Sequence, residues 1–209
     1  MPKQARGLKT RGLVLDAAAR EFAQYGYAEA NLQRIADRIG MTKGALYAHF
    51  ATKEELAEVF AGHLAQAGEE LLADQQIGSG EPLEGLRALM LGAASLLQQD
   101  DWAHAAFRLA VEEACATGVP PALPVRIGCA VRQLVARAQQ GRGCGAAVDP
   151  AVPADLVVAV LFGAYGTGAA LERAGLRTRV AGLWELLATT LGAAGSAGAA
   201  RTRVELWRY

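Results

Sequence analysis

Apolar residues recur along most of the chain at intervals of three and four, the spacing that places them on one side of an α-helix. The alternation typical of strands is almost absent, and helix-favouring Ala, Leu, Glu, Gln and Arg dominate. The pattern predicts an all-α protein with helices at about residues 8–25, 31–39, 43–49, 53–73, 82–98, 100–116, 124–140, 153–173 and 178–194. The apolar face of the first helix is formed by Val14, Ala18, Phe22 and Tyr25.

Residues that begin or end helices mark the boundaries of the first four segments. Gly26 follows the first helix and can adopt the left-handed backbone that stops one. Asn31 and Thr42 are of the residue types that cap helix N-termini. Thr52 with Glu55 three residues later predicts a capping box at the start of the fourth helix.

The stretch Asn31–Phe50, NLQRIADRIGMTKGALYAHF, has the residue types of a helix-turn-helix. Two helices that meet at a steep angle need a small residue where their backbones approach, which is Ala36, and a residue tolerant of positive φ at the turn, which is Gly40. Apolar residues must fill the angle, and those available are Ile35, Ile39, Met41 and Leu46. The sequence therefore predicts an N-terminal three-helix unit of this kind.

The second helix of such a motif lies in the DNA major groove with its N-terminal residues toward the base edges. Thr42 can meet a phosphate, Lys43 can reach a base or a phosphate, and two small residues let the backbone approach the groove. Taken singly, each residue also has a structural interpretation, such as packing for a tyrosine or solvation for a lysine. The predicted DNA-binding set is Asn31, Thr42, Lys43, Gly44, Ala45, Tyr47, His49 and Lys53.

Charge is distributed unevenly although the net charge is zero. Residues 1–54 hold nine Lys or Arg against five Asp or Glu, and the excess lies in Lys3, Arg6, Lys9 and Arg11. A basic arm before a balanced domain favours a polyanion partner. We therefore predict a DNA-binding domain with a basic arm at 1–54, a helical effector-binding and dimerisation domain at 55–195, and a flexible tail at 196–209.

The last two predicted helices are rich in apolar and small residues, including Gly163, Ala164, Gly166, Gly168 and Ala169. Such faces suit a two-fold four-helix interface between two copies of the chain, although burial within one subunit is the alternative. Two reading helices about one turn of DNA apart would then read a palindromic operator.

A pocket for a small molecule is predicted in the larger domain from aromatic residues beside hydrogen-bond donors. The candidates are Trp102, Phe107, Arg108, Phe162 and Tyr165, with His104 nearby. The alternative is that the aromatic residues belong to the core and that Arg108 pairs with Glu112, four residues on, on a solvated face.

Residues 10–60 resemble the DNA-binding domain of TetR-type transcriptional repressors. The resemblance rests on F-A-x-x-G-Y, I-A-x-x-x-G, T-K-G-A-L-Y-x-H-F and the following K-E-E-L. It implies a dimeric repressor that a small effector releases from double-stranded operator DNA. Three positions depart from the family pattern: Arg34 stands where an acid usually closes a capping box, Ala30 replaces Thr or Ser, and Glu21 takes a usually apolar place.

A narrower resemblance, to the γ-butyrolactone receptor group, rests on the same motif with A-x-x-R-L-A and P-x-L-P. It implies a γ-butyrolactone- or furan-like signal as effector. In that group a pocket tryptophan follows the Leu-Pro pair, and Gly128 stands at that place here. The alternative is therefore an orphan pseudo-receptor with another ligand, such as an antibiotic or a lipophilic metabolite, or with none.

Other classes of protein are less well supported. Cys115, Cys129 and Cys144 are far apart and form no metal-ligand spacing with histidine, so we predict reduced thiols, no metal and no cofactor. A helical enzyme would need a nucleophile–base pair that the scattered histidines and cysteines do not offer, and a protein-interaction module that keeps the motif as a scaffold is a further alternative. No apolar run spans a bilayer and the N-terminus lacks the apolar segment of a signal peptide, so we expect a cytoplasmic protein without a membrane partner.

Overall fold

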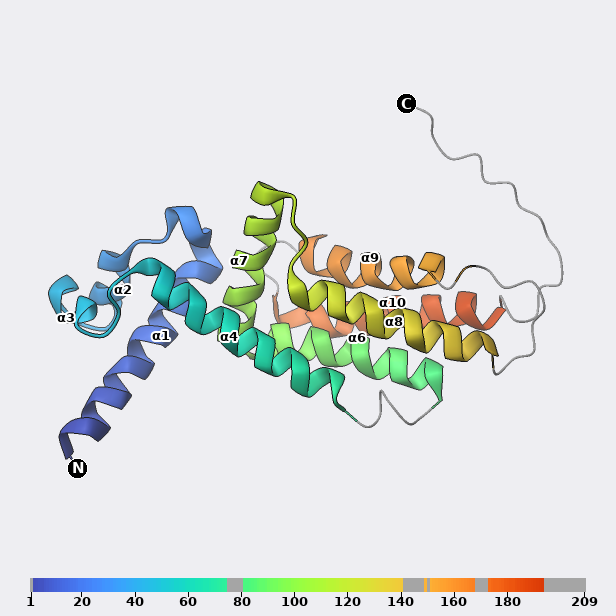
Figure 1. Ribbon diagram of the computed structural model, residues 1–209, viewed down its shortest axis with the longest axis horizontal. Helices are drawn as coiled ribbons and strands as arrows, with labels where there is room; N and C mark the ends of the chain where they lie inside the picture. The colour runs from blue at the N-terminus through green and yellow to red at the C-terminus, as the bar shows by residue number, and fades with distance from the viewer. Residues whose placement is uncertain (1, 75–80, 141–148, 150, 168–172, 194–209) are drawn as a thin grey trace.

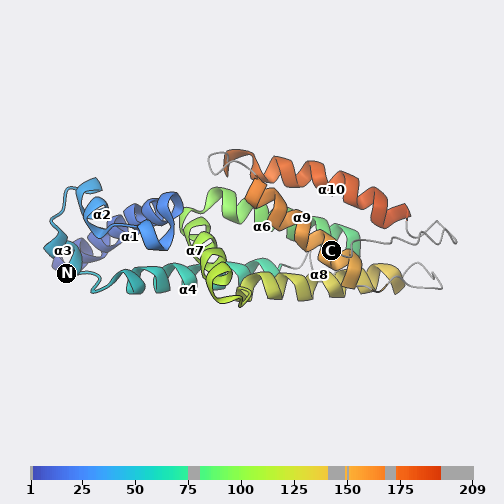
Figure 2. The ribbon, with the colours of Figure 1, turned by 90° about the horizontal axis from the view of Figure 1, so that it is seen from above.

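The computed structural model describes residues 2–74, 81–140, 149, 151–167 and 173–193 (Figure 1). The elements in these residues are all helical, which confirms the predicted all-α class. Helices α1 to α3 lie at one end of an elongated molecule, and α6, α8, α9 and α10 pack together at the other (Figure 2). The predicted tail, Cys144 and the small residues Gly168 and Ala169 lie outside the described residues.

The N-terminal unit contains α1 (Pro2–Glu29), α2 (Leu32–Arg38) and α3 (Lys43–Tyr47). Helix α1 begins six residues earlier than predicted, because the predicted basic arm continues the helix instead of preceding it. At the predicted stop, Gly26 has φ 73° and ψ −173°, which breaks the helix before it resumes to Glu29. Helix α3 ends at Tyr47, two residues earlier than predicted.

The predicted N-caps form as expected. The Asn31 side chain accepts a hydrogen bond from the Gln33 amide, and the hydroxyls of Thr42 and Thr52 accept from amides three residues on. The second bond of the predicted capping box is shifted by one residue: the Glu55 carboxylate accepts from the amide of Ala51 instead of from that of the cap residue Thr52. Helices α2, α3 and α4 therefore start where the sequence predicts.

The body contains α4 (Lys53–Leu72), α6 (Pro82–Gln99), α7 (Asp101–Thr117), α8 (Ala122–Gln140), α9 (Ala151–Thr167), a 3₁₀ turn (Arg173–Gly175) and α10 (Leu176–Ala193). Helix α4 runs from the N-terminal unit into the body, and α7 crosses between α1 and the other body helices (Figure 1). The predicted domain boundary at residue 54 falls in the first turn of α4, so one continuous helix connects the two units.

The buried residues form a connected core that extends through both units. Val14, Ala18 and Phe22 are fully buried as predicted. The fourth residue of the predicted apolar face, Tyr25, is 37% exposed, and its ring lies under the Arg34 guanidinium, 4.3 Å from the ring centroid. Tyr25 therefore makes a cation–π contact at the surface instead of packing in the core.

Candidate nucleic-acid interface and effector cavity

The turn between α2 and α3 brings the two helices together through the residues that the sequence indicated. Ala36 and Leu46 are fully buried, and Gly40 has φ 67°. The amide of Met41 donates to the carbonyl of Ala36 at 2.9 Å, which closes the turn. The geometry is that of a helix-turn-helix.

Helix α3 is fixed to the protein by one side and presents the other to solvent. Leu46 is its buried residue, whereas Lys43, Gly44 and Ala45 are exposed and Tyr47 is 44% exposed. The Lys43 ammonium lies 5.8 Å from the centroid of the Tyr47 ring, so these two predicted DNA contacts form one surface. An exposed side of this kind is what a helix-turn-helix presents to the major groove.

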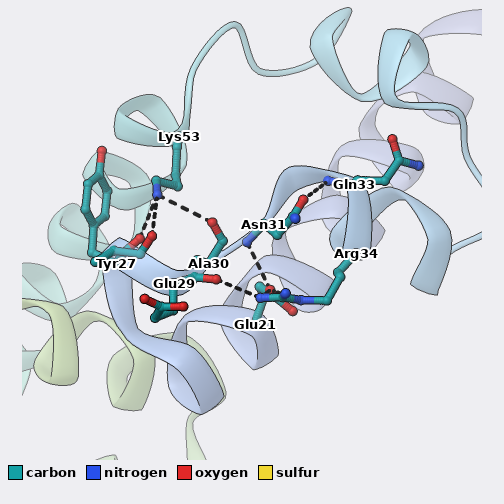
Figure 3. Close-up of polar contacts among 9 residues, drawn as sticks. Glu21, Tyr27, Glu29, Ala30, Asn31, Gln33, Arg34 and Lys53 are labelled. Atoms are coloured by element: carbon teal, nitrogen blue, oxygen red, sulfur yellow. Dashed lines mark hydrogen bonds and ion pairs between the residues drawn. The ribbon is translucent and has the colours of Figure 1, made fainter.

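Two other residues of the predicted set have roles inside the fold. The Thr42 hydroxyl accepts from the Ala45 amide at 3.2 Å, and this bond leaves its own hydrogen available to a phosphate. The Lys53 ammonium donates to the carbonyl of Tyr27 at 2.7 Å, lies 3.4 Å from that of Ala30, and stands 4.4 Å from the Tyr27 ring centroid (Figure 3). Lys53 therefore neutralises the carbonyl end of α1, and its contact with DNA stays a prediction.

Glu21 and Arg34, two departures from the family pattern, are bonded to each other in the structure (Figure 3). Glu21 is fully buried, and its Oε1 accepts from the Arg34 Nε at 2.7 Å and from the Asn31 amide at 3.0 Å. Arg34 also donates to the Glu29 carbonyl at 2.7 Å. Glu21 thus supplies, from α1, the carboxylate that the family pattern places at residue 34. The sequence signal for this pair was that Glu21 takes a place where the family pattern is apolar and Arg34 a place where it is acidic.

Arg11, one of the four basic residues near the N-terminus, is used to hold α3. Its Nη1 donates to the carbonyl of His49 at 3.1 Å, and its guanidinium lies 4.0 Å above the Phe50 ring. The half-buried His49 therefore takes part in anchoring the chain after α3 through its backbone. Sequence reasoning assigned Arg11 only to a charged arm, because charge counting does not reveal a long-range partner.

Two of the five predicted pocket residues contact α1. The Trp102 indole N–H donates to Asp16 Oδ1 at 2.9 Å. Arg108 donates to the carbonyl of Ala23 at 2.6 Å and to Glu112 at 2.9 Å, while Glu112 accepts from the Tyr27 amide at 2.9 Å. The alternative pairing of Arg108 with Glu112 is thus present, but at the partly buried contact between α7 and α1 instead of on a solvated face.

The other three predicted pocket residues, Phe107, Phe162 and Tyr165, line an apolar cavity of about 20 Å³. Phe107 stacks on Phe162 with centroids 5.6 Å apart and meets Tyr165 edge-on at 4.8 Å. The remaining walls are aliphatic, from Leu71, Ala93, Leu96, Leu97, Leu123, Ile127 and Leu161. The structure therefore divides the predicted set between the cavity and the contact with α1.

His104 lies beside this aromatic group, with its ring centroid 5.7 Å from that of Tyr165. Burial lowers the pKa of His104 to about 4, so the ring is neutral near pH 7. Its Nδ1 is buried and has no hydrogen-bond partner among the described residues. Gly128 leaves space bounded by Arg132 and by Val158 of α9, each 3.8 Å from where a Cβ would lie, so no aromatic ring fills this part of α8.

Neither the cysteines nor the metal-ligating residues form a site within the described part of the chain. Cys115 and Cys129 are exposed thiols. No group of three or more His, Cys, Asp or Glu side chains there could hold a metal ion. Among the same residues no single helix is long and apolar enough to cross a membrane, and α7 with α8 meets those criteria only as a pair bent by 96°.

Comparison with known proteins follows the same division of the chain. The family model of bacterial regulatory proteins of the tetR family matches residues 14–59. The A-factor receptor protein of Streptomyces griseus is 34% identical over 88% of this chain, which spans 64% of that protein's length.

Solved structures extend the likeness to the body. One, described as the molecular basis for control of antibiotic production by bacterial hormones, is 32% identical, with a TM-score of 0.64 over 86% of this chain and 95% of that one. A gamma-butyrolactone receptor is 26% identical, with a TM-score of 0.70 over 91% of this chain and 98% of the other.

Proposed function

The chain belongs to the tetR family of bacterial regulatory proteins, and on that premise we propose that it is a cytoplasmic, ligand-responsive repressor that binds a palindromic operator as a homodimer. The observation that carries the proposal is the exposed face of α3, where Lys43 and Tyr47 lie together while Leu46 anchors the helix. Four of the five residues of α3 are exposed, as is required of a helix that enters the major groove.

The proposed DNA contacts divide into base-reading and phosphate-positioning groups. Lys43, with Gly44 and Ala45 beside it, enters the major groove and reaches a base or a phosphate there, since small residues let the backbone approach the bases. The phosphate contacts come from Asn31, Thr42, Tyr47, His49 and Lys53, which flank α3.

The proposed dimer uses α9 and α10. Val152 and Leu156, one turn apart on α9, are 62% and 45% exposed, and Leu186 on α10 is 68% exposed. Gly163 continues the exposed side of α9, with no atom within 4 Å of where a Cβ would lie. A second copy of the chain would cover these apolar residues and would place the two α3 helices for a palindrome.

The proposed effector is a γ-butyrolactone- or furan-like signal, which the likeness to receptors of that kind supports. A specific observation favours a second candidate: Gly128 stands where the group has a pocket tryptophan, and among the described residues only Arg132 and Val158 lie within 4 Å of where its Cβ would be. An orphan regulator that binds an antibiotic or another lipophilic metabolite, or no ligand, is therefore the alternative.

The proposed mechanism has two states. Without effector the dimer holds both α3 helices at the operator spacing, and an effector favours a conformation that separates them. Repression is relieved only by as much as the effector's affinity differs between the two states.

A gel shift with the DNA upstream of the chain's own gene tests the function, with native mass spectrometry of the same preparation to give the oligomeric state. We expect a sequence-preferring complex that contains two copies of the chain. An enzyme or an interaction scaffold would show no preference over shuffled DNA of equal length.

A further inference from the structure

The apolar cavity shares one lining residue with a second, larger hollow. This outer hollow, of about 440 Å³, lies between α4, α6 and the start of α10, and its lining includes Leu71, Arg87, Leu91, Gly92, Ser95 and Arg177. Leu71 is the residue that the described linings of the cavity and the outer hollow have in common. It lies in the last turn of α4, where Figure 1 shows α4 running beside α6.

The packing position of the Leu71 side chain depends on Gly92 of α6. A Cβ at Gly92 would lie 2.4 Å from the Leu71 Cδ1, a distance that real atoms do not reach, so the leucine tip occupies space that only glycine leaves. Leu71 itself is half-buried, with the outer hollow on one side. The Leu71 side chain therefore has open space beside it on the side of the outer hollow.

The cavity in its present form is too small for an effector. Pockets for small molecules usually hold about 300–1,000 Å³, and the cavity holds about 20 Å³. Space for a ligand must come from a lining side chain that moves, and Leu71 is the one with open volume behind it. The outer hollow has the volume that the cavity lacks.

We propose that Leu71 is the gate through which the apolar chain of the proposed effector enters the cavity, while the oxygen-bearing head stays outside. The chain takes the place of the Leu71 side chain and extends between Phe107 and Phe162. The head stays in the outer hollow, where Arg87, Arg177 and the Ser95 hydroxyl can donate hydrogen bonds. The proposal rests on the proposed function in that the occupant is the effector.

Charge in the outer hollow supports an uncharged head. Two basic residues of its lining, Arg87 and Arg177, are balanced by two acidic ones, Asp74 and Glu84. The cavity adds no charged group. An anionic or cationic ligand would lose solvation without meeting an excess of opposite charge.

The position of the gate on α4 connects it to the proposed DNA interface. Lys53, at the other end of the same helix, holds the carbonyls of the α1–α2 turn. Eighteen residues of helix separate the two, or about 27 Å at 1.5 Å per residue. Leu71 therefore lies on the same continuous helix as the residue that holds the α1–α2 turn.

Stopped-flow tryptophan fluorescence can measure access to the cavity, using γ-butyrolactone, γ-octalactone and γ-dodecalactone as probes. We expect γ-dodecalactone to bind the wild-type protein at least ten-fold more tightly than γ-butyrolactone, and dodecanoate at least ten-fold more weakly than γ-dodecalactone. Leu71→Ala should raise the association rate of γ-dodecalactone about ten-fold. The matched control is Leu72→Ala, a neighbouring half-buried leucine that lines neither space, which should change the rate less than two-fold.

A second variant tests the route without weakening the core. Leu91→Trp fills the outer hollow and should slow association about ten-fold while thermal unfolding stays at the wild-type temperature. Equal rates for the two leucine-to-alanine variants, an unchanged rate in Leu91→Trp, or no lactone binding by any variant would each overturn the gate. A gel shift of the same preparations separates the two proposals: sequence-preferring DNA binding with any of these outcomes leaves the repressor standing and removes only the gate.

Discussion

Glu21 and Arg34 form a charge pair, and removing Arg34 alone should be more damaging than removing both partners. Glu21 is fully buried and receives hydrogen bonds from Arg34 and from the Asn31 amide. In Arg34→Ala the carboxylate would stay buried with one of its two donors lost. In Glu21→Leu the Arg34 side chain, already 43% exposed, can return to water.

The magnitude follows from this asymmetry. Breaking a buried ion pair by removing one partner costs about 3–5 kcal/mol, and the exposure of Arg34 screens the pair, so we expect the lower part, about 2–3 kcal/mol, for Arg34→Ala. Glu21→Leu loses the acceptor of the Asn31 amide, about 1 kcal/mol. Adding Arg34→Ala to Glu21→Leu should then cost almost nothing, which gives a coupling of about 2 kcal/mol between the two positions.

Thermal unfolding of the wild type, both single variants and the double variant, followed by circular dichroism, measures this cycle. For a chain of this size about 1 kcal/mol shifts the midpoint by about 2–4 °C, so Arg34→Ala should unfold about 4–12 °C below the wild type. The double variant should unfold within about 2 °C of Glu21→Leu, by the same conversion. The reasoning is refuted if Arg34→Ala costs the same in both backgrounds.

Three further predictions concern other contacts of the described structure. Gly26→Ala should cost about 1–3 kcal/mol, because a side chain is strained at φ 73° and its Cβ would lie 2.2 Å from Glu112 Oε1. Urea unfolding checks this against Gly12→Ala inside α1, which meets no atom within 4 Å and should stabilise the chain by about 0.5–1 kcal/mol. Burial lowers the pKa of His104 from 6.5 to about 4, so between these pH values the unfolded chain binds a proton that the folded chain does not, and stability should fall as the pH drops through this window. His104→Leu should reduce the dependence of the urea unfolding midpoint on pH in this window, and an unchanged dependence would contradict the assignment. Arg11→Lys should weaken operator binding about as much as Arg11→Ala, because a lysine keeps the charge but not the planar stack over Phe50. Wild-type operator affinity of Arg11→Lys in fluorescence anisotropy would show that charge alone matters.

The helix-turn-helix could be predicted from sequence because each of its requirements concerns a single residue or a short spacing. A small residue at Ala36, a glycine at the turn and an apolar residue at Leu46 are local conditions, and the structure meets all three. The caps at Asn31, Thr42 and Thr52 are equally local. Hydrophobic periodicity then gives the ends of the body helices to within two residues, except for the predicted helix 153–173: α9 is Ala151–Thr167, and Arg173 belongs to the 3₁₀ turn.

The polar contacts between elements could not be predicted in the same way. Periodicity indicates which side of a helix is apolar, but not which distant carbonyl or carboxylate a charged side chain meets. Arg11 reaches the carbonyl of residue 49, Lys53 reaches that of residue 27, and Arg108 reaches that of residue 23. Each looked like a surface or pocket charge in the sequence, and each holds two elements together in the fold.

The residues that line the cavity could be predicted from the sequence only in part. Aromatic residues at Phe107, Phe162 and Tyr165 suggested a pocket, and these three do meet around one cavity. Trp102 is aromatic too and was predicted in the pocket for that reason, but it lies on the side of α7 that contacts α1. The rotation of a helix between two neighbours, and not residue type, decides which aromatic residue faces the cavity.

Operator affinity of the wild type and of a Lys43→Ala, Tyr47→Phe double variant, measured by fluorescence anisotropy over a range of salt concentrations, tests most directly whether α3 enters DNA. Each lysine–phosphate contact contributes about one unit to the slope of log affinity against log salt. Our account predicts that the double variant loses at least ten-fold in affinity and that its slope is shallower, while thermal unfolding is unchanged. Wild-type affinity and slope in the double variant would contradict the assignment of α3 as the reading helix.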